Sequence, residues 1–139
     1  IAQAGRMTAE IPRLWFGAPV PITWDNEAVL ERAIHAGRGI VFLTPHMGCF
    51  EVTAQAVAQR YGSRLGALTV LYRPARQAPL AALMLAARAR PGLQLAATNL
   101  AGVRSMIKAL RQGQAVGLLP DQVPPLGMGQ WAPFFGRDA

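Results

Sequence analysis

Short apolar runs alternate with segments of helical periodicity along this chain. Residues 39–44, 66–72 and 115–119 form runs without regular polar alternation, which is typical of strands covered on both faces. A further short strand is predicted at 93–97 and another at 131–135. Because the strands alternate with helices, we predict an α/β fold with a mainly parallel central sheet and helices on both faces. Residues 39–44 are expected to form a central strand.

The segments between these runs predict four helices, at residues 24–36, 48–61, 80–90 and 100–112. The first is expected to be capped by Asp25 and to end at Gly37. The helix predicted at 100–112 is the most clearly amphipathic of the four. Its apolar face is expected to hold Val103, Met106, Ile107 and Leu110, and its basic face Arg104, Lys108 and Arg111.

Residues 1–22 differ from the rest of the chain. Pro12, Pro19 and Pro21 interrupt this stretch, which predicts the end of a preceding element followed by an extended connector. Residues 23–139 are expected to form one partial domain. The chain opens on Ile1 and stops in a predicted strand, so we expect it to be part of a longer protein with a truncated fold.

Composition narrows the classes of function. The chain has 139 residues, of which 52% are hydrophobic, and a formal net charge of +7 that arginine dominates. Such a surface suits anionic lipid, an acidic protein or nucleic acid. The absence of Lys/Arg runs and of interleaved aromatic residues argues against nucleic acid. Cys49 is the only cysteine, which excludes an internal disulfide and a Cys/His zinc cluster.

Chemistry-bearing side chains follow three of the predicted strands. His46, Arg73 and Asp121 each come just after an apolar run. Ligands of parallel sheets bind beyond the carboxyl ends of the strands, so we expect these residues to converge there. The sequence therefore predicts a site at that edge of the sheet.

The strongest candidate is His46 with Glu51, five residues apart. The two would not share a helical face, but a carboxylate at the start of a helix can reach back to a ring in the preceding turn. Glu51 would then orient His46 as a general base. The alternative is a histidine hydrogen-bonded in a turn beside a solvated glutamate. A Cys49–His46 nucleophile is a further alternative, although adjacent positions do not bring side chains into contact.

The segment His46-Met47-Gly48-Cys49-Phe50-Glu51 resembles the His-four-residues-acid (HX4E) box of membrane acyltransferases. Its surroundings resemble the bacterial lipid A late acyltransferases of lauroyl/myristoyl type. The resemblance is carried, in the family's order, by residues 39–51, Leu71-Tyr72-Arg73-Pro74, residues 108–113, Leu119-Pro120-Asp121-Gln122 and Pro133-Phe134-Phe135-Gly136. It covers most of residues 24–139.

The resemblance implies transfer of a fatty acyl chain from an acyl carrier protein thioester to a hydroxyl of a lipid A precursor. His46 would be the base and Glu51 its partner, with no acyl-enzyme, cofactor or metal. The protein would work on the cytoplasmic face of the bacterial inner membrane, against the membrane surface, and the basic helical face at 100–112 would be solvated or would contact the carrier.

The same resemblance implies roles for other residues. Arg73 and Arg88 would hold lipid phosphate or stabilise the thioester oxyanion. Asp121 would hold an arginine or support the base, and Gln122 would bind substrate beside it. Phe134 and Phe135 would wall an acyl groove. From the residues alone, these side chains are equally a set of surface arginines, a turn-forming acid and core aromatics.

Two other functions remain open at this point. One is an acyltransferase for a different glycolipid or glycerolipid acceptor. The other is a non-catalytic basic module that binds anionic lipid or acyl carrier. In the second case His46→Ala would leave function intact, whereas changes of arginine would weaken binding in a salt-dependent way.

Overall fold

The computed structural model describes residues 2–124, 126–127 and 129–138. Its elements are α1 (Ala2–Phe16), α2 (Glu27–Ala36), β1 (Ile40–Leu43), α3 (Glu51–Leu65), β2 (Leu68–Tyr72), α4 (Ala78–Arg88), β3 (Leu93–Ala97), α5 (Leu100–Arg111), β4 (Ala115–Leu118), β5 (Pro133–Phe134) and β6 (Arg137–Asp138). From α2 to β4 the strands and helices alternate as the sequence predicts. The strand predicted at 131–135 is limited to Pro133–Phe134, which pairs only with β6 in a separate hairpin.

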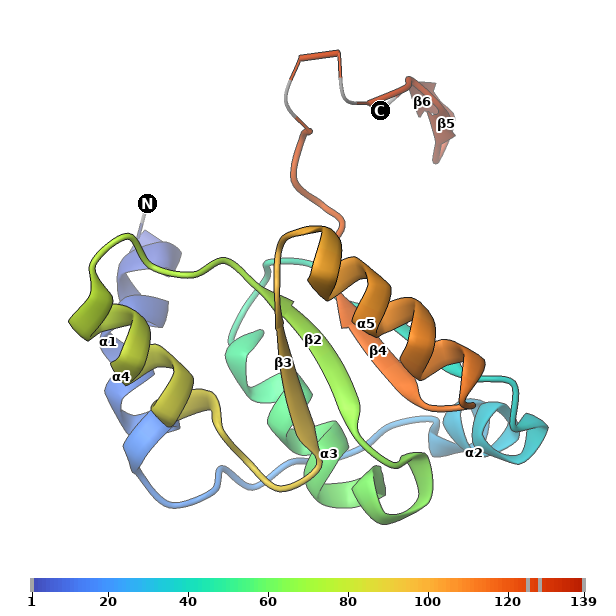
Figure 1. Cartoon of the computed structure of the whole chain (residues 1–139), viewed down its shortest axis with the longest axis horizontal. Helices are drawn as coiled ribbons and strands as arrows, with labels where there is room; N and C mark the ends of the chain where they lie inside the picture. The colour runs from blue at the N-terminus through green and yellow to red at the C-terminus, as the bar shows by residue number, and fades with distance from the viewer. Residues whose placement is uncertain (1, 125, 128, 139) are drawn as a thin grey trace.

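The body of the molecule is a four-stranded parallel sheet between helices, shown in Figure 1. The strand order is β1-β4-β2-β3, and all three pairings are parallel. Helix α3 packs on one face of the sheet and α5 on the other, as the two separate core clusters show. The predicted α/β fold with helices on both faces is therefore confirmed. The short β5–β6 hairpin lies at the end of an arm that leaves the body after β4 (Figure 1).

The place of β1 differs from the prediction. β1 is an edge strand, and the central strands are β4 and β2. On β1 the side chains of Val41 and Leu43 are 47% and 66% exposed, whereas Ala115 and Val116 of β4 are 0% and 1% exposed. The prediction was wrong because an apolar run reports burial propensity, while the order of parallel strands is set by the crossovers between them.

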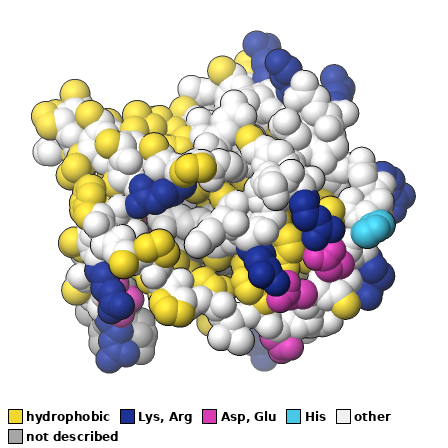
Figure 2. Space-filling view, turned by 90° about the horizontal axis from the view of Figure 1, so that it is seen from below, with side chains coloured by type: hydrophobic (Ala, Val, Ile, Leu, Met, Phe, Trp, Pro, Cys, Tyr) yellow, Lys and Arg dark blue, Asp and Glu magenta, His cyan; other side chains and the backbone are white. Residues whose placement is uncertain are grey.

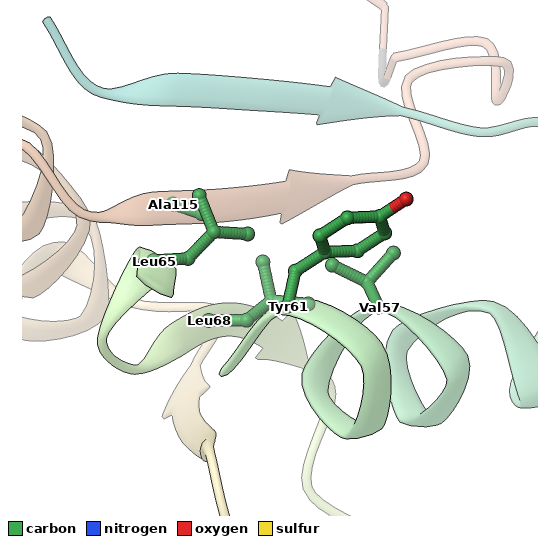
Figure 3. Close-up of a cluster of buried hydrophobic side chains, with 5 residues drawn as sticks. All are labelled: Val57, Tyr61, Leu65, Leu68 and Ala115. Atoms are coloured by element: carbon green, nitrogen blue, oxygen red, sulfur yellow. The ribbon is translucent and has the colours of Figure 1, made fainter. Parts of the chain in front are cut away.

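Both faces of the sheet are buried by alternate residues of the same strands. Toward α3, Leu68 and Ala115 pack with Val57, Tyr61 and Leu65, as Figure 3 shows. Toward α5, Val116 packs with Met106 and Ala109. The buried face of α5 is therefore centred on Met106 and Ala109, while Val103 and Ile107, expected on that face, are about half exposed.

Several predicted helix ends shift in the structure. Gly37 ends α2 in the left-handed conformation as predicted, but Asn26, not Asp25, occupies the N-cap position. Gly62, expected to end the next helix, lies inside α3, which continues to Leu65 and ends at Gly66. Glycine costs only about 1 kcal/mol inside a helix, so packing of Tyr61 and Leu65 outweighs it.

Charged side chains join α2 to α3 near the amino ends of the strands. Arg64 donates two hydrogen bonds of 2.7 Å to the carboxylate of Glu31, and Arg60 and Tyr61 both donate to Glu27. Figure 2 shows acidic and basic side chains side by side at this end of the molecule. These pairs hold α2 against α3, the helix that begins at the candidate site.

Residues 2–16 form a helix despite Pro12, and residues 18–24 have no regular secondary structure. Helix α1 packs on α3 and α4 through Leu14 and Trp15. It is therefore part of the wall behind the candidate site. Within the described residues, no helix is both long and apolar enough to cross a bilayer.

Candidate active site

The turns after β1 and β4 bring His46 and Asp121 together. The two strands are parallel neighbours, and their pairing continues to Thr44, whose backbone N–H donates to the carbonyl of Leu118 at 3.1 Å. Both strands end at the same edge of the sheet, and the chain continues there into a turn. Residues 75 positions apart in sequence thus meet, as expected for side chains beyond the carboxyl ends of parallel strands.

Asp121 holds His46 with both carboxylate oxygens. Oδ1 lies 2.7 Å from Nδ1 of the imidazole, and Oδ2 accepts the backbone N–H of His46 at 2.7 Å. These bonds lower the pKa of Asp121 below its ordinary value, the ring contact having the larger effect. An ionised Asp121 favours the proton on Nδ1, which leaves Nε2 as the acceptor nitrogen. The ring also packs edge-on against Phe50, with centroids 4.9 Å apart.

Glu51 does not contact the His46 ring, and the predicted contact between them is wrong. The Glu51 carboxylate accepts from Nε of Arg88 at 3.1 Å and from the terminal nitrogen Nη2 of the same residue. It also accepts from Nε1 of Trp15 at 3.3 Å. The Glu51 side chain is only 8% exposed, and a buried carboxylate requires a paired charge. Arg88 supplies that charge, and Asp121 takes the place predicted for Glu51.

Trp15 is a site-associated residue that sequence reasoning missed. Its ring lies under the guanidinium of Arg88 at 5.5 Å, a distance at which a cation and an aromatic face attract. Its carbonyl accepts from Arg90 at 2.5 Å. Nothing in the local pattern links Trp15 to Glu51, 36 positions away, or to Arg90, 75 positions away.

A cavity of about 360 Å³ opens beside His46, between α3 and the sheet. Its charged lining residues are Glu51, Arg73 and Arg88, beside His46. Deeper in, the lining comes from apolar side chains of all four strands and of α3, among them Phe42, Val57, Leu68, Val70, Leu93 and Leu95. A cavity that is polar at one end and apolar at the other suits a molecule with a reactive polar group and a hydrocarbon chain.

The other predicted substrate-binding residues divide into two groups. Arg73 and Arg88 line the cavity, as expected for residues that would face substrate. Gln122 is exposed just beyond Asp121 and does not line it. Phe134 and Phe135 are 65% and 93% exposed on the β5–β6 arm and contact each other. The expectation that they wall this cavity is wrong.

Cys49 is not placed for nucleophilic chemistry. Its side chain packs into the cluster of Leu14, Trp15 and Ala87, and burial is the main reason why the pKa of its thiol is raised. A raised pKa leaves less of the reactive thiolate. Among the described residues, no three His, Cys, Asp or Glu side chains are grouped so that they could hold a metal ion.

A parallel α/β sheet with a carboxylate-held imidazole at the mouth of an apolar cavity is consistent with a transferase that handles a hydrocarbon chain. The family profile of bacterial lipid A biosynthesis acyltransferases matches residues 1–139, the whole chain, which therefore belongs to this family. A comparison with curated proteins finds no match.

Proposed function

We propose that His46 is the general base of an acyl transfer from an acyl carrier protein thioester to a hydroxyl of a lipid A precursor. Nε2 takes the hydroxyl proton while the alcohol oxygen bonds to the thioester carbonyl carbon. The carbon–sulfur bond then breaks, and the sulfur leaves as a thiol with the proton carried by the imidazolium. Asp121 fixes the tautomer and stabilises the imidazolium charge.

The observation that supports this proposal most is that His46, whose ring is held by Asp121, lines the cavity beside its apolar part. An acyl chain in the cavity would leave its carbonyl carbon near Nε2. The guanidinium groups of Arg73 and Arg88 lie on the same lining. Arg88, held by Glu51, is suited to stabilise the oxyanion of the tetrahedral intermediate, and the exposed Arg73 is suited to a lipid phosphate.

The lipid acceptor implies work at a membrane surface, which we propose to be the cytoplasmic face of the inner membrane. Exposed leucines of α4, Leu80 and Leu83, and the arginine excess of the chain support such a contact. Apolar side chains interleaved with cations favour the interface of an anionic bilayer.

The test is acyl transfer from a defined acyl carrier thioester to a lipid A precursor, with His46→Ala and His46→Gln compared with the wild type. Loss of a positioned base should lower kcat by about 10²–10⁴-fold. The Tm should stay nearly unchanged, because the side chain is 33% exposed. Transfer by His46→Ala at the wild-type rate would reject the base assignment, and transfer only to another hydroxyl lipid would reject the acceptor.

A further inference from the structure

The cavity is built from successive layers of side chains across the sheet. Near its mouth, Thr44, Leu119 and Tyr72 line it; these residues follow or end β1, β4 and β2. Two residues back along each strand, Phe42 pairs in register with Gly117, and Gly117 pairs with Val70. This second layer lies about 6.6 Å deeper, at roughly 3.3 Å per residue.

Gly117 is the only member of the second layer without a side chain, among the described residues that line it. An added Cβ would lie 3.0 Å from Cγ1 of Val70, the strand neighbour whose side chain also lines the cavity. The next atom would be Cδ1 of Leu68, at 4.0 Å. A side chain at position 117 would therefore project among the lining side chains that lie between the mouth and the far end of the strands, where Leu68 and Leu93 line the cavity.

The backbone does not account for a glycine at this position. Gly117 has no positive φ and lies within β4, in register on both sides. Glycine weakens a strand interior, and it is found there where another group approaches the backbone closely. The neighbouring central positions, Ala115 and Val116, carry side chains and are fully buried. The group that approaches Gly117 is Cγ1 of Val70, so the missing side chain leaves room both for Val70 and for the cavity that the two residues line.

We infer that Gly117 sets the length of acyl chain that the site accepts, by leaving open the passage to the deep part of the cavity. This inference rests on the proposed function, because it takes the ligand of the cavity to be the acyl chain of the donor. A side chain at 117 would stop the chain at the second layer. Shorter donors would still place their carbonyl beside His46, whereas longer donors would not.

The experiment measures kcat/KM for donors in a series of saturated acyl carrier thioesters that differ by two carbons, with wild type, Gly117→Ala and Gly117→Val. A pocket discriminates one methylene by about 10-fold or more. Gly117→Val should therefore shift the preferred donor to a shorter chain, with at least a 10-fold change in the ratio of long-chain to short-chain kcat/KM. Gly117→Ala should shift it less, in the same direction.

Gly62→Ala is the matched control, since it also adds one methyl group to a glycine, but inside α3, where the nearest atom is Cα of Gly92 at 3.8 Å. It should keep the wild-type chain preference. If wild type transfers no acyl chain, the proposed function fails. If wild type transfers and both Gly117 variants keep its preference, only this inference fails. If Gly117→Val does not fold, Gly117→Ala decides, because its methyl group displaces only the tip of Val70.

Discussion

At the scale of single residues, two carboxylates compete for the role of partner to one imidazole. Asp121 is about one-third exposed and reaches His46 from the turn after β4. Glu51 is nearly buried and is neutralised by Arg88. The two acids therefore hold different partners: Asp121 holds the imidazole of His46, whereas the nearly buried Glu51 pairs with the part-buried cation of Arg88.

This difference predicts opposite effects of two matched amide substitutions. Asp121→Asn should lower kcat by about 10²–10⁴-fold, because the imidazolium loses its counter-charge and its tautomer is no longer fixed. Its Tm should change little, because the pair is exposed. Glu51→Gln should destabilise the fold by about 1–3 kcal/mol, because the part-buried guanidinium of Arg88 loses its counter-charge. Activity assays and thermal unfolding of both variants measure the contrast.

The assignment of Asp121 would be wrong if Asp121→Asn kept full activity. It would also be wrong if a folded Glu51→Gln lost as much activity as His46→Ala while its Tm stayed at the wild-type value. In that case Glu51 would serve the base in the reacting complex, as the spacing of the box predicts.

The sequence predicted that His46 and Asp121 lie at the same edge of the sheet, but it assigned the contact with the imidazole to Glu51. His46, Arg73 and Asp121 follow apolar runs, and the rule for parallel sheets then places them together. Which acid reaches the ring depends on the neighbour of β1 in the sheet and on Arg88 and Trp15, which lie 37 and 36 positions from Glu51. Such distant contacts leave no trace in local spacing.

At the scale of elements, the joint between α2 and α3 depends on carboxylates with lowered pKa. The hydroxyl of Tyr61 is the main cause for Glu27, and the guanidinium of Arg64 is the main cause for Glu31. A carboxyl group whose pKa falls on folding adds stability at pH values above its unfolded pKa, and this stability is lost as pH falls through the folded pKa.

We therefore expect a Glu27→Gln/Glu31→Gln variant to be less stable than wild type at neutral pH and to lose less stability on acidification. The difference should shrink as pH falls from the ordinary carboxyl pKa of 4.5 through the lowered values. Urea unfolding at a series of pH values measures it. Tyr61→Phe should reproduce part of the effect through Glu27 alone. Parallel stability curves for wild type and the double variant would contradict the lowered pKa values.

The sequence was enough to predict which residues form most strands and helices, but not where each of these elements lies in the fold. Residues 93–97 and 100–111 have the bounds that the pattern predicts to within one residue. The edge position of β1 and the exposure of Val103 and Ile107 were not predicted, because an apolar residue reports only its own preference for burial. For residues 1–22 the sequence predicts the end of a preceding element and a connector. It does not predict that this element is a helix of 15 residues that continues through Pro12 and packs through Trp15.

At the scale of the whole molecule, the positive charge is unevenly neutralised. Four of the seven acidic residues are engaged in ion pairs, two of them at the α2–α3 joint and two at the site. Arg73 and Arg76 are exposed on the loop after β2, at the edge of the sheet where the cavity opens. Lys108 and Arg111 are exposed at the end of α5, which runs back to the opposite edge.

The proposed approach of the cavity mouth to an anionic membrane predicts that these two pairs of cations are not equivalent. Arg73→Gln/Arg76→Gln and Lys108→Gln/Arg111→Gln each remove two positive charges, so the net charge of the two variants is equal. Binding to vesicles of mixed neutral and anionic phospholipid should fall by about 10-fold or more in the first variant and much less in the second, because attraction to lipid charge fades within a Debye length. Co-sedimentation at low and high ionic strength measures both, and the wild-type binding should also weaken with salt. Equal losses in the two variants would mean that net charge alone governs binding, and would remove the support for a membrane-facing cavity mouth.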